Sequence, residues 1–111
     1  MLLAKNPAGW SEVLHWVAEA AAPVVIAVNA RVADGKDPSW LWDVPYELLR
    51  GLPVAAAGER HLDVAVRLRY AEVDHQVEAD PLRAAALLPG EEPVLVCTYT
   101  QFSALYRRYG R

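Results

Sequence analysis

The sequence predicts an α/β fold, a three-layer αβα sandwich built on a mostly parallel, Rossmann-like sheet. Short apolar runs rich in valine alternate along the chain with segments of helical periodicity, and the runs show no polar alternation. Strands that are covered on both faces need such runs, and covered faces are typical of parallel sheets. Since the chain has 111 residues and is 54% hydrophobic, we expect one domain, residues 1–111, with a real core.

The first elements follow from caps and periodicity. Residues 1–4 form a short apolar run, which predicts an opening strand. Asn6 and Pro7 are typical of a helix start, with asparagine as the cap and proline at the first helical position. One apolar stripe of helical spacing follows: Trp10, Val13, Leu14, Val17 and Ala18. Residues 23–28 predict a strand buried on both faces, and residues 29–42 a long irregular segment.

The middle of the chain predicts a short helix, a strand and a longer helix. The short helix covers residues 45–50 and the buried strand residues 53–57. Gly58 turns the chain into a helix over residues 59–70. Two faces of this helix can point inward, and the pattern leaves both open: Leu62, Val66 and Tyr70, or Ala65 and Leu68.

The C-terminal third continues the alternation. Residues 75–78 predict a weak strand, after which Asp80 and Pro81 cap and begin a helix that runs through Leu88. Pro89 and Gly90 end that helix. Residues 93–98 predict the last buried strand and residues 100–109 the last helix.

Composition excludes several classes of protein. The net charge is −3 with no basic patch, which argues against nucleic-acid binding. No apolar run approaches the roughly 18–20 residues of a membrane span, and residues 1–10 do not resemble a signal peptide. Cys97 is the only cysteine, so an internal disulfide and a cysteine-based metal site are excluded. We expect a cytoplasmic protein that is not integral to the membrane and holds no metal.

Acidic and aromatic side chains gather in one loop, residues 33–43. The loop contains three aspartates and two of the four tryptophans: Asp34, Asp37, Asp43, Trp40 and Trp42. It follows a predicted parallel strand, and in such sheets ligands and partners meet the loops at the carboxyl ends of the strands. A purely structural interpretation is a turn at Asp34 and a helix cap at Asp37. Because aromatic residues are enriched at interfaces, partner contact through Trp40 and Trp42 is the alternative.

A carboxylate in such a loop suits one catalytic task, which is to hold a histidine in the tautomer that activates a nucleophile. The sequence offers no matching nucleophile. The serines lack the G-x-S-x-G elbow, and Cys97 lies in an apolar run. His15, His61 and His75 lack metal-ligand spacing and are interpreted as structural or surface residues. No phosphate-binding glycine motif is present, although Lys5 and Asn6 precede a helix N-terminus that suits an anion.

Three segments together resemble a known family. Residues 3–9 (LAKNPAG), 25–29 (VIAVN) and 33–44 (ADGKDPSWLWDV) are similar to the C-terminal domain of the MurT subunit of lipid II isoglutaminyl synthase, a relative of the Mur ligases. Residues 63–71 and 98–100 match later motifs of that domain. The likeness covers about residues 3–106, and its A-D-G-x-D-x-S-W-x-W-D pattern is long and unusual.

The resemblance implies the Rossmann-like fold of Mur ligase C-terminal domains and a role in a complex. The complete MurT subunit uses ATP and Mg²⁺ to activate the D-glutamate of lipid II. A GatD-type glutaminase supplies ammonia through a Cys–His pair, which yields D-isoglutamine for peptidoglycan. An aspartate of this domain is thought to complete the glutaminase triad across the interface. The complex would act at the inner face of the membrane.

Asp37 is the first choice for that aspartate, because a residue in the middle of the loop can project outward. Asp43 is the second, since it lies near the next helix and can cap it, and Asp34 is the third. Lys5 and Asn6 match the family's K-N-P motif and would face the nucleotide cleft of the whole subunit.

Two departures from the family are visible. Residues 43–47 read D-V-P-Y-E where the family resembles D-V-D-F-E, so Pro45 replaces an acidic residue, and residues 74–93 form a shorter segment. The central ATP-binding domain and its four-cysteine zinc ribbon are absent from this sequence. We therefore expect an excised domain or a naturally reduced relative, which binds no cofactor and has no ligase activity alone. The alternatives are a stand-alone module for a small anion or nucleotide, and an interaction module without chemistry.

Overall fold

The computed structural model describes residues 2–3, 7–28, 42–90 and 92–97, and these form an all-parallel sheet flanked by helices. The described strands follow the order β1-β5-β2-β3-β4. They are β1 (Leu2–Leu3), β2 (Val24–Ala27), β3 (Val54–Ala57), β4 (Gln76–Val77) and β5 (Val94–Cys97). The helices are α1 (Pro7–Ala20), α2 (His61–Tyr70), α3 (Pro81–Leu87) and the 3-10 turn η3 (Tyr46–Leu49).

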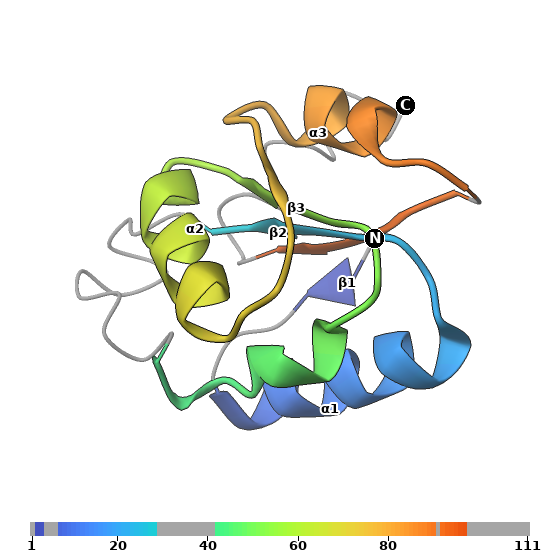
Figure 1. The fold of residues 1–111 in the computed structure, drawn as a ribbon, viewed down its shortest axis with the longest axis vertical. Helices are drawn as coiled ribbons and strands as arrows, with labels where there is room; N and C mark the ends of the chain where they lie inside the picture. Colours follow the sequence, from blue (N-terminus) through green and yellow to red (C-terminus); the bar gives the residue numbers. More distant parts are fainter. Residues whose placement is uncertain (1, 4–6, 29–41, 91, 98–111) are drawn as a thin grey trace.

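Helices cover both faces of the sheet, as Figure 1 shows: α3 lies on one side, and α1 with η3 on the other. Alternate residues of each central strand enter different cores. Val24, Ile26 and Val28 pack with α1, η3 and α2. Val25 and Ala27 pack with Ala84 and Leu88, at the end of α3. Period-two side chains that are buried on both faces explain why these strands read as continuous apolar runs. The three-layer prediction is confirmed.

Most predicted element starts are confirmed. Helix α1 begins at Pro7, and its predicted stripe is the buried one, with Trp10, Leu14 and Val17 fully covered. Asp80 caps α3 by accepting a hydrogen bond from the Leu82 backbone N–H at 2.9 Å. The predicted short helix over 45–50 is a 3-10 turn, and α2 begins at His61, two residues later than predicted.

One of the two faces offered for α2 is wrong. Leu62, Val66 and Tyr70 point to solvent, with 65%, 52% and 74% of their surface exposed. The buried side chains of α2 are Val64, Arg67 and Leu68. The inward face thus includes Leu68 of the other predicted set, with Ala65 packed at its margin. The apolar stripe Leu62, Val66 and Tyr70 does not determine which face of α2 is buried. The face with Arg67 points inward, because only then does Arg67 reach its partners Val44 and Glu47.

The carboxyl ends of the central strands lie side by side at one edge of the sheet. Leu3 pairs with Cys97, which in turn pairs with Ala27. From β2 the chain proceeds to β3 and β4 on one side, whereas β5 lies on the other side, so the strand order reverses between β2 and β5. Such a switch point is where open α/β sheets bind their ligands and partners. The sequence segments that begin at residues 4, 29 and 98 follow these three strand ends.

Gly58 allows the chain to turn at this edge. Its φ is +86°, and a Cβ there would lie 2.6 Å from the Val28 carbonyl oxygen and 2.7 Å from the Val28 nitrogen. The same carbonyl accepts a hydrogen bond from the Arg60 backbone N–H at 2.8 Å. Only glycine fits this backbone conformation and close approach. The turn therefore fixes Val28, the last described residue before the loop. The predicted last helix, residues 100–109, lies outside the described residues.

Candidate partner-docking site

Arg67 of α2 organises the turn of residues 42–47, which follows the predicted loop in the sequence. Its Nη2 donates a 2.8 Å hydrogen bond to the Val44 carbonyl oxygen, and its two terminal nitrogens donate to the Glu47 carboxylate at 3.3 and 3.4 Å. The guanidinium carbon lies 5.1 Å from the centre of the Tyr46 ring and 5.5 Å from that of Trp42. Since the residue is only 6% exposed, its charge is compensated by this one cluster.

Trp42 is held on the outer side of the same cluster. Its ring meets Tyr70 edge to face, with 4.9 Å between centroids and 81° between planes. It remains 48% exposed. An indole that packs on two neighbours and still presents half its surface is typical of an interface residue. This fits the predicted docking role of Trp42, which stays a prediction.

The ionisation of the cluster follows from its contacts. A hydrogen bond from its own backbone N–H lowers the pKa of Glu47, burial opposes this, and Arg67 and Arg50 lower the pKa further. Burial raises the pKa of Tyr46 well above its usual range, although the charge of Arg67 opposes this. The turn therefore carries an ionised Glu47 and a neutral Tyr46 at neutral pH.

Asp43 is exposed between two anchored neighbours. Trp42 before it packs on Arg67, and Val44 after it is fully buried and accepts the Arg67 hydrogen bond. The predicted capping role of Asp43 is wrong. The N-cap of η3 is Pro45, and no side-chain hydrogen bond caps that turn. The Asp43 carboxylate is thus presented at the surface by a fixed backbone, which was the property that the loop aspartate needed.

The other predicted site residues lie outside the described residues: Asp34, Asp37, Trp40, Lys5 and Asn6. Their assignments remain predictions. The structure describes the residues on either side of these two segments. Leu3 and Pro7 flank the segment with Lys5 and Asn6, and Val28 and Trp42 flank the predicted loop.

The remaining reactive side chains have local structural partners. In each histidine, Nδ1 lies 2.8 Å from a nearby carbonyl oxygen, to which it donates: Ser11 for His15, Gly58 for His61 and Val73 for His75. Cys97 is fully buried in the sheet. Within the described ranges no three metal-binding side chains gather. None of the described helices is long and apolar enough to cross a bilayer.

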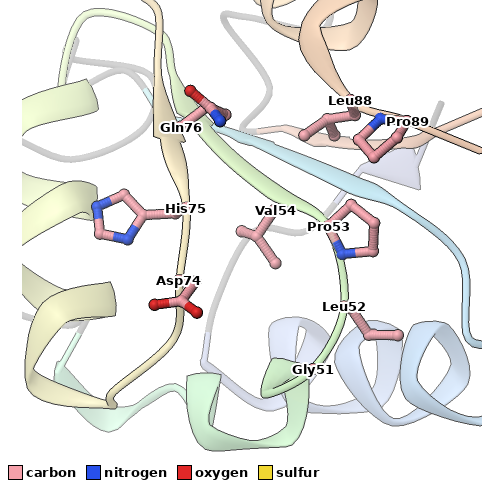
Figure 2. A pocket seen from close by; sticks show the side chains of 9 residues that line it. All are labelled: Gly51, Leu52, Pro53, Val54, Asp74, His75, Gln76, Leu88 and Pro89. Atoms are coloured by element: carbon pink, nitrogen blue, oxygen red, sulfur yellow. The ribbon is translucent and has the colours of Figure 1, made fainter.

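A pocket of about 370 Å³ lies at the opposite edge of the sheet, where β3 and β4 begin (Figure 2). Its polar lining consists of Asp74, His75 and Gln76, and its apolar lining includes Val54 and Leu88. The His75 ring is already engaged with the Val73 carbonyl. Because ligands of open α/β sheets bind at the carboxyl ends of the strands, the fold does not favour a ligand here.

Sequence reasoning missed Arg67 and Glu47 as parts of the site. The available signal was helical spacing, since Arg67 lies in register with Val64 and Ala71, both of which are buried. An arginine in a core stripe requires a buried or half-buried acidic partner, and Glu47 is the one that the fold brings to it.

Fold and site together define a class: a Rossmann-like α/β domain with an exposed Trp–Asp turn. A family model described as MurT ligase C-terminal matches residues 3–102. The MurT subunit of the glutamine-hydrolyzing lipid II isoglutaminyl synthase of Streptococcus pneumoniae is 36% identical over 74 residues, which is 62% of this chain. The corresponding subunit of Staphylococcus aureus strain COL is 37% identical over 91 residues, or 76% of this chain.

The chain belongs to the MurT ligase C-terminal family, as the sequence motifs indicated. It covers 17% of the length of the pneumococcal relative and 21% of the staphylococcal one. The family and the fold are therefore shown for this chain, whereas the activity of the whole subunit is a matter for proposal.

Proposed function

We propose that this chain serves a lipid II isoglutaminyl synthase by docking a GatD-type glutaminase and supplying an aspartate to its Cys–His pair. Its curated relatives are subunits of a glutamine-hydrolyzing enzyme, which requires a nucleophile. The observation that carries the proposal is the turn of residues 42–44, where an exposed carboxylate stands between two anchored residues beside a half-exposed tryptophan.

The chemistry needs only a fixed carboxylate from this side. An aspartate that accepts the Nδ1–H of a histidine holds the imidazole in the tautomer that takes a proton from a cysteine, and it stabilises the imidazolium that forms. The partner supplies the cysteine and the histidine. Asp37 and Asp43 are the two leading candidates, with Asp34 third. The structural finding that Asp43 does not cap η3 removes one of the two reasons for ranking it below Asp37.

In this proposal the rest of the subunit would hold ATP and Mg²⁺, which would supply the activation of the D-glutamate carboxylate of lipid II that amidation by ammonia requires. The complex works on the cytoplasmic side of the membrane in this proposal. Lys5 and Asn6, which precede α1 in the sequence, are the residues of this chain that would contact the nucleotide in this proposal. The rest of the subunit would supply the remaining contacts.

The proposal is tested by single Asp→Asn changes at positions 34, 37 and 43 of this chain. Each variant is assembled with a GatD-type glutaminase, and glutamate release is measured. One variant should lose roughly 10⁴-fold in kcat with unchanged assembly, because an amide holds the wrong histidine tautomer. If all three retain full turnover, triad completion by this loop is excluded.

The alternative predicted from the sequence is a stand-alone module for a small anion or nucleotide that uses Lys5 and Asn6. It predicts that ATP with Mg²⁺ raises the melting temperature of the chain and that a glutaminase does not bind. A size-exclusion assay with the glutaminase and a thermal-shift assay with ATP separate the two functions.

A further inference from the structure

We propose that Arg67 is a positioning residue that fixes Asp43 for the reaction of the partner. This inference rests on the proposed function and narrows it to one carboxylate. Asp43 lies in a turn that Arg67 contacts both before and after it, through the Trp42 ring and the Val44 carbonyl. The placement of the carboxylate thus depends on one buried guanidinium from a helix 24 residues later in the sequence.

The turn is restrained at Val44, at Trp42 and through Arg67 itself. The 2.8 Å hydrogen bond sets the position of the Val44 peptide, and the burial of the Val44 side chain sets its orientation. The Trp42 ring is held from two sides, by the guanidinium and by Tyr70. Glu47 anchors Arg67 itself through both terminal nitrogens. A side chain between two fixed neighbours has few backbone conformations left, which is how a catalytic group is preorganised.

Only arginine meets these demands together. A planar guanidinium can donate in its own plane to a carbonyl and a carboxylate while its face lies against aromatic rings. A lysine ammonium keeps the charge but cannot stack and donate in this way. Methionine keeps much of the length and apolar contact of the side chain and removes every hydrogen bond.

The chain offers a matched control. Arg69 lies on the same helix and is exposed, so Arg69→Met makes the same chemical change away from the cluster.

The test is a double-variant cycle of Arg67→Met and Asp43→Asn in this chain, assembled with a GatD-type glutaminase at saturating concentration. Arg67→Met should lower the glutaminase kcat at least about tenfold, with KM for glutamine unchanged. The double variant should be no slower than Asp43→Asn alone, because Arg67 acts only through that carboxylate. Arg69→Met should keep full kcat.

A second readout is amide hydrogen exchange of residues 42–48. Arg67→Met should speed it at least about tenfold, while the amides of β2 and β3 keep their protection. Unchanged exchange in this turn overturns the inference, as does a double variant whose losses multiply. If Arg67→Met fails to fold, Arg67→Lys is measured in its place, with the same expectations.

The outcomes separate this inference from the proposed function. If Asp37→Asn abolishes turnover and Asp43→Asn does not, the proposed function stands and the role of Arg67 is wrong. If no aspartate variant loses turnover, the proposed function itself fails. Hydrogen exchange then still decides whether Arg67 holds the turn.

Discussion

At the scale of single residues, the buried Arg67 is both the charge that the fold must compensate and the group that fixes the turn before Glu47. A buried arginine is tolerated only where hydrogen bonds and an opposite charge replace its hydration. Here the Val44 carbonyl, Glu47 and two aromatic rings provide that environment. The same contacts fix the end of the loop, so the stability of the cluster and the placement of Asp43 have one physical cause.

Glu47 gives the cluster a predictable dependence on pH. Its pKa is lowered in the folded chain from an ordinary value of 4.5, so its contribution is complete above pH 4.5 and is lost as pH falls through the lower folded value. We expect Glu47→Gln to cost about 0.5–1 kcal/mol at pH 7, a modest amount because the carboxylate is half exposed.

That cost should shrink below pH 4.5, since the wild-type carboxylate is then protonated as well. Urea denaturation of both proteins between pH 7 and pH 3 measures it, with Glu12→Gln on the exposed side of α1 as the control. A cost that stays constant across this range would show that the ion pair with Arg67 contributes no stability.

At the scale of elements, the tightest constraint lies at Gly58, where the end of β3 passes the end of β2. We expect Gly58→Ala to lower the free energy of unfolding by at least about 2 kcal/mol, because the new methyl group would meet the Val28 backbone at a positive φ. Thermal unfolding measures the loss. Gly51 has a similar φ of +86° with open space around it.

Gly51→Ala is therefore the matched control for the strain of φ alone, and it should cost only about 1 kcal/mol. If the two substitutions lower the free energy of unfolding equally, the close approach of Gly58 to Val28 does not contribute to the loss.

The orientation of α2 is a second prediction at this scale. Val64→Ala should cost about 1–3 kcal/mol, because Val64 is fully buried in the core. Val66→Ala, two residues further along the same helix, should change the free energy of unfolding by no more than about 0.5 kcal/mol, because Val66 is 52% exposed. Equal costs in chemical denaturation would contradict the packing described for this helix.

These elements also show what the sequence can and cannot predict. Runs such as residues 24–27 specify covered strands, and Asp80 with Pro81 specifies a helix start, because both signals are local. The inward face of α2 was left ambiguous, since its choice depends on Glu47 and Val44, which lie 20 and 23 residues before Arg67. Local periodicity contains no information about that contact.

The candidate site, like α2, was predicted from the sequence only in part. The motif at residues 33–44 located the loop and the exposed Asp43 and Trp42, because unusual composition is visible in sequence. The anchoring of the turn by Arg67 was not predicted, since it joins segments that only the fold brings together. Asp43 was given a capping role that the structure contradicts, because Pro45 fixes the start of η3 instead.

At the scale of the whole molecule, the buried sheet and the exposed turn have separate roles in the proposed function. Strands β2 and β3 are buried along their length, the switch point lies between β2 and β5, and an acidic, aromatic turn faces outward beside α2. In the proposed function this turn presents a carboxylate to another protein. Membership of the MurT ligase C-terminal family gives that arrangement its proposed use.

The exposed stripe of α2 is a second part of the proposed docking surface. Leu62, Val66 and Tyr70 continue from Trp42 along one surface. We expect Tyr70→Ala to weaken binding of a GatD-type glutaminase by about 1–2 kcal/mol, as loss of an interface aromatic commonly does. Isothermal titration calorimetry measures this, and Leu87→Ala, an exposed position on α3, should leave binding unchanged.

The most direct measurement is the glutaminase turnover of the assembled complex with Asn at position 37, at position 43 and at both. One single variant should lose roughly 10⁴-fold in kcat, the double variant should lose no more, and assembly should be unaffected. Full turnover in the double variant and in Asp34→Asn would contradict the proposed function, because no carboxylate of this loop would then complete the partner's triad.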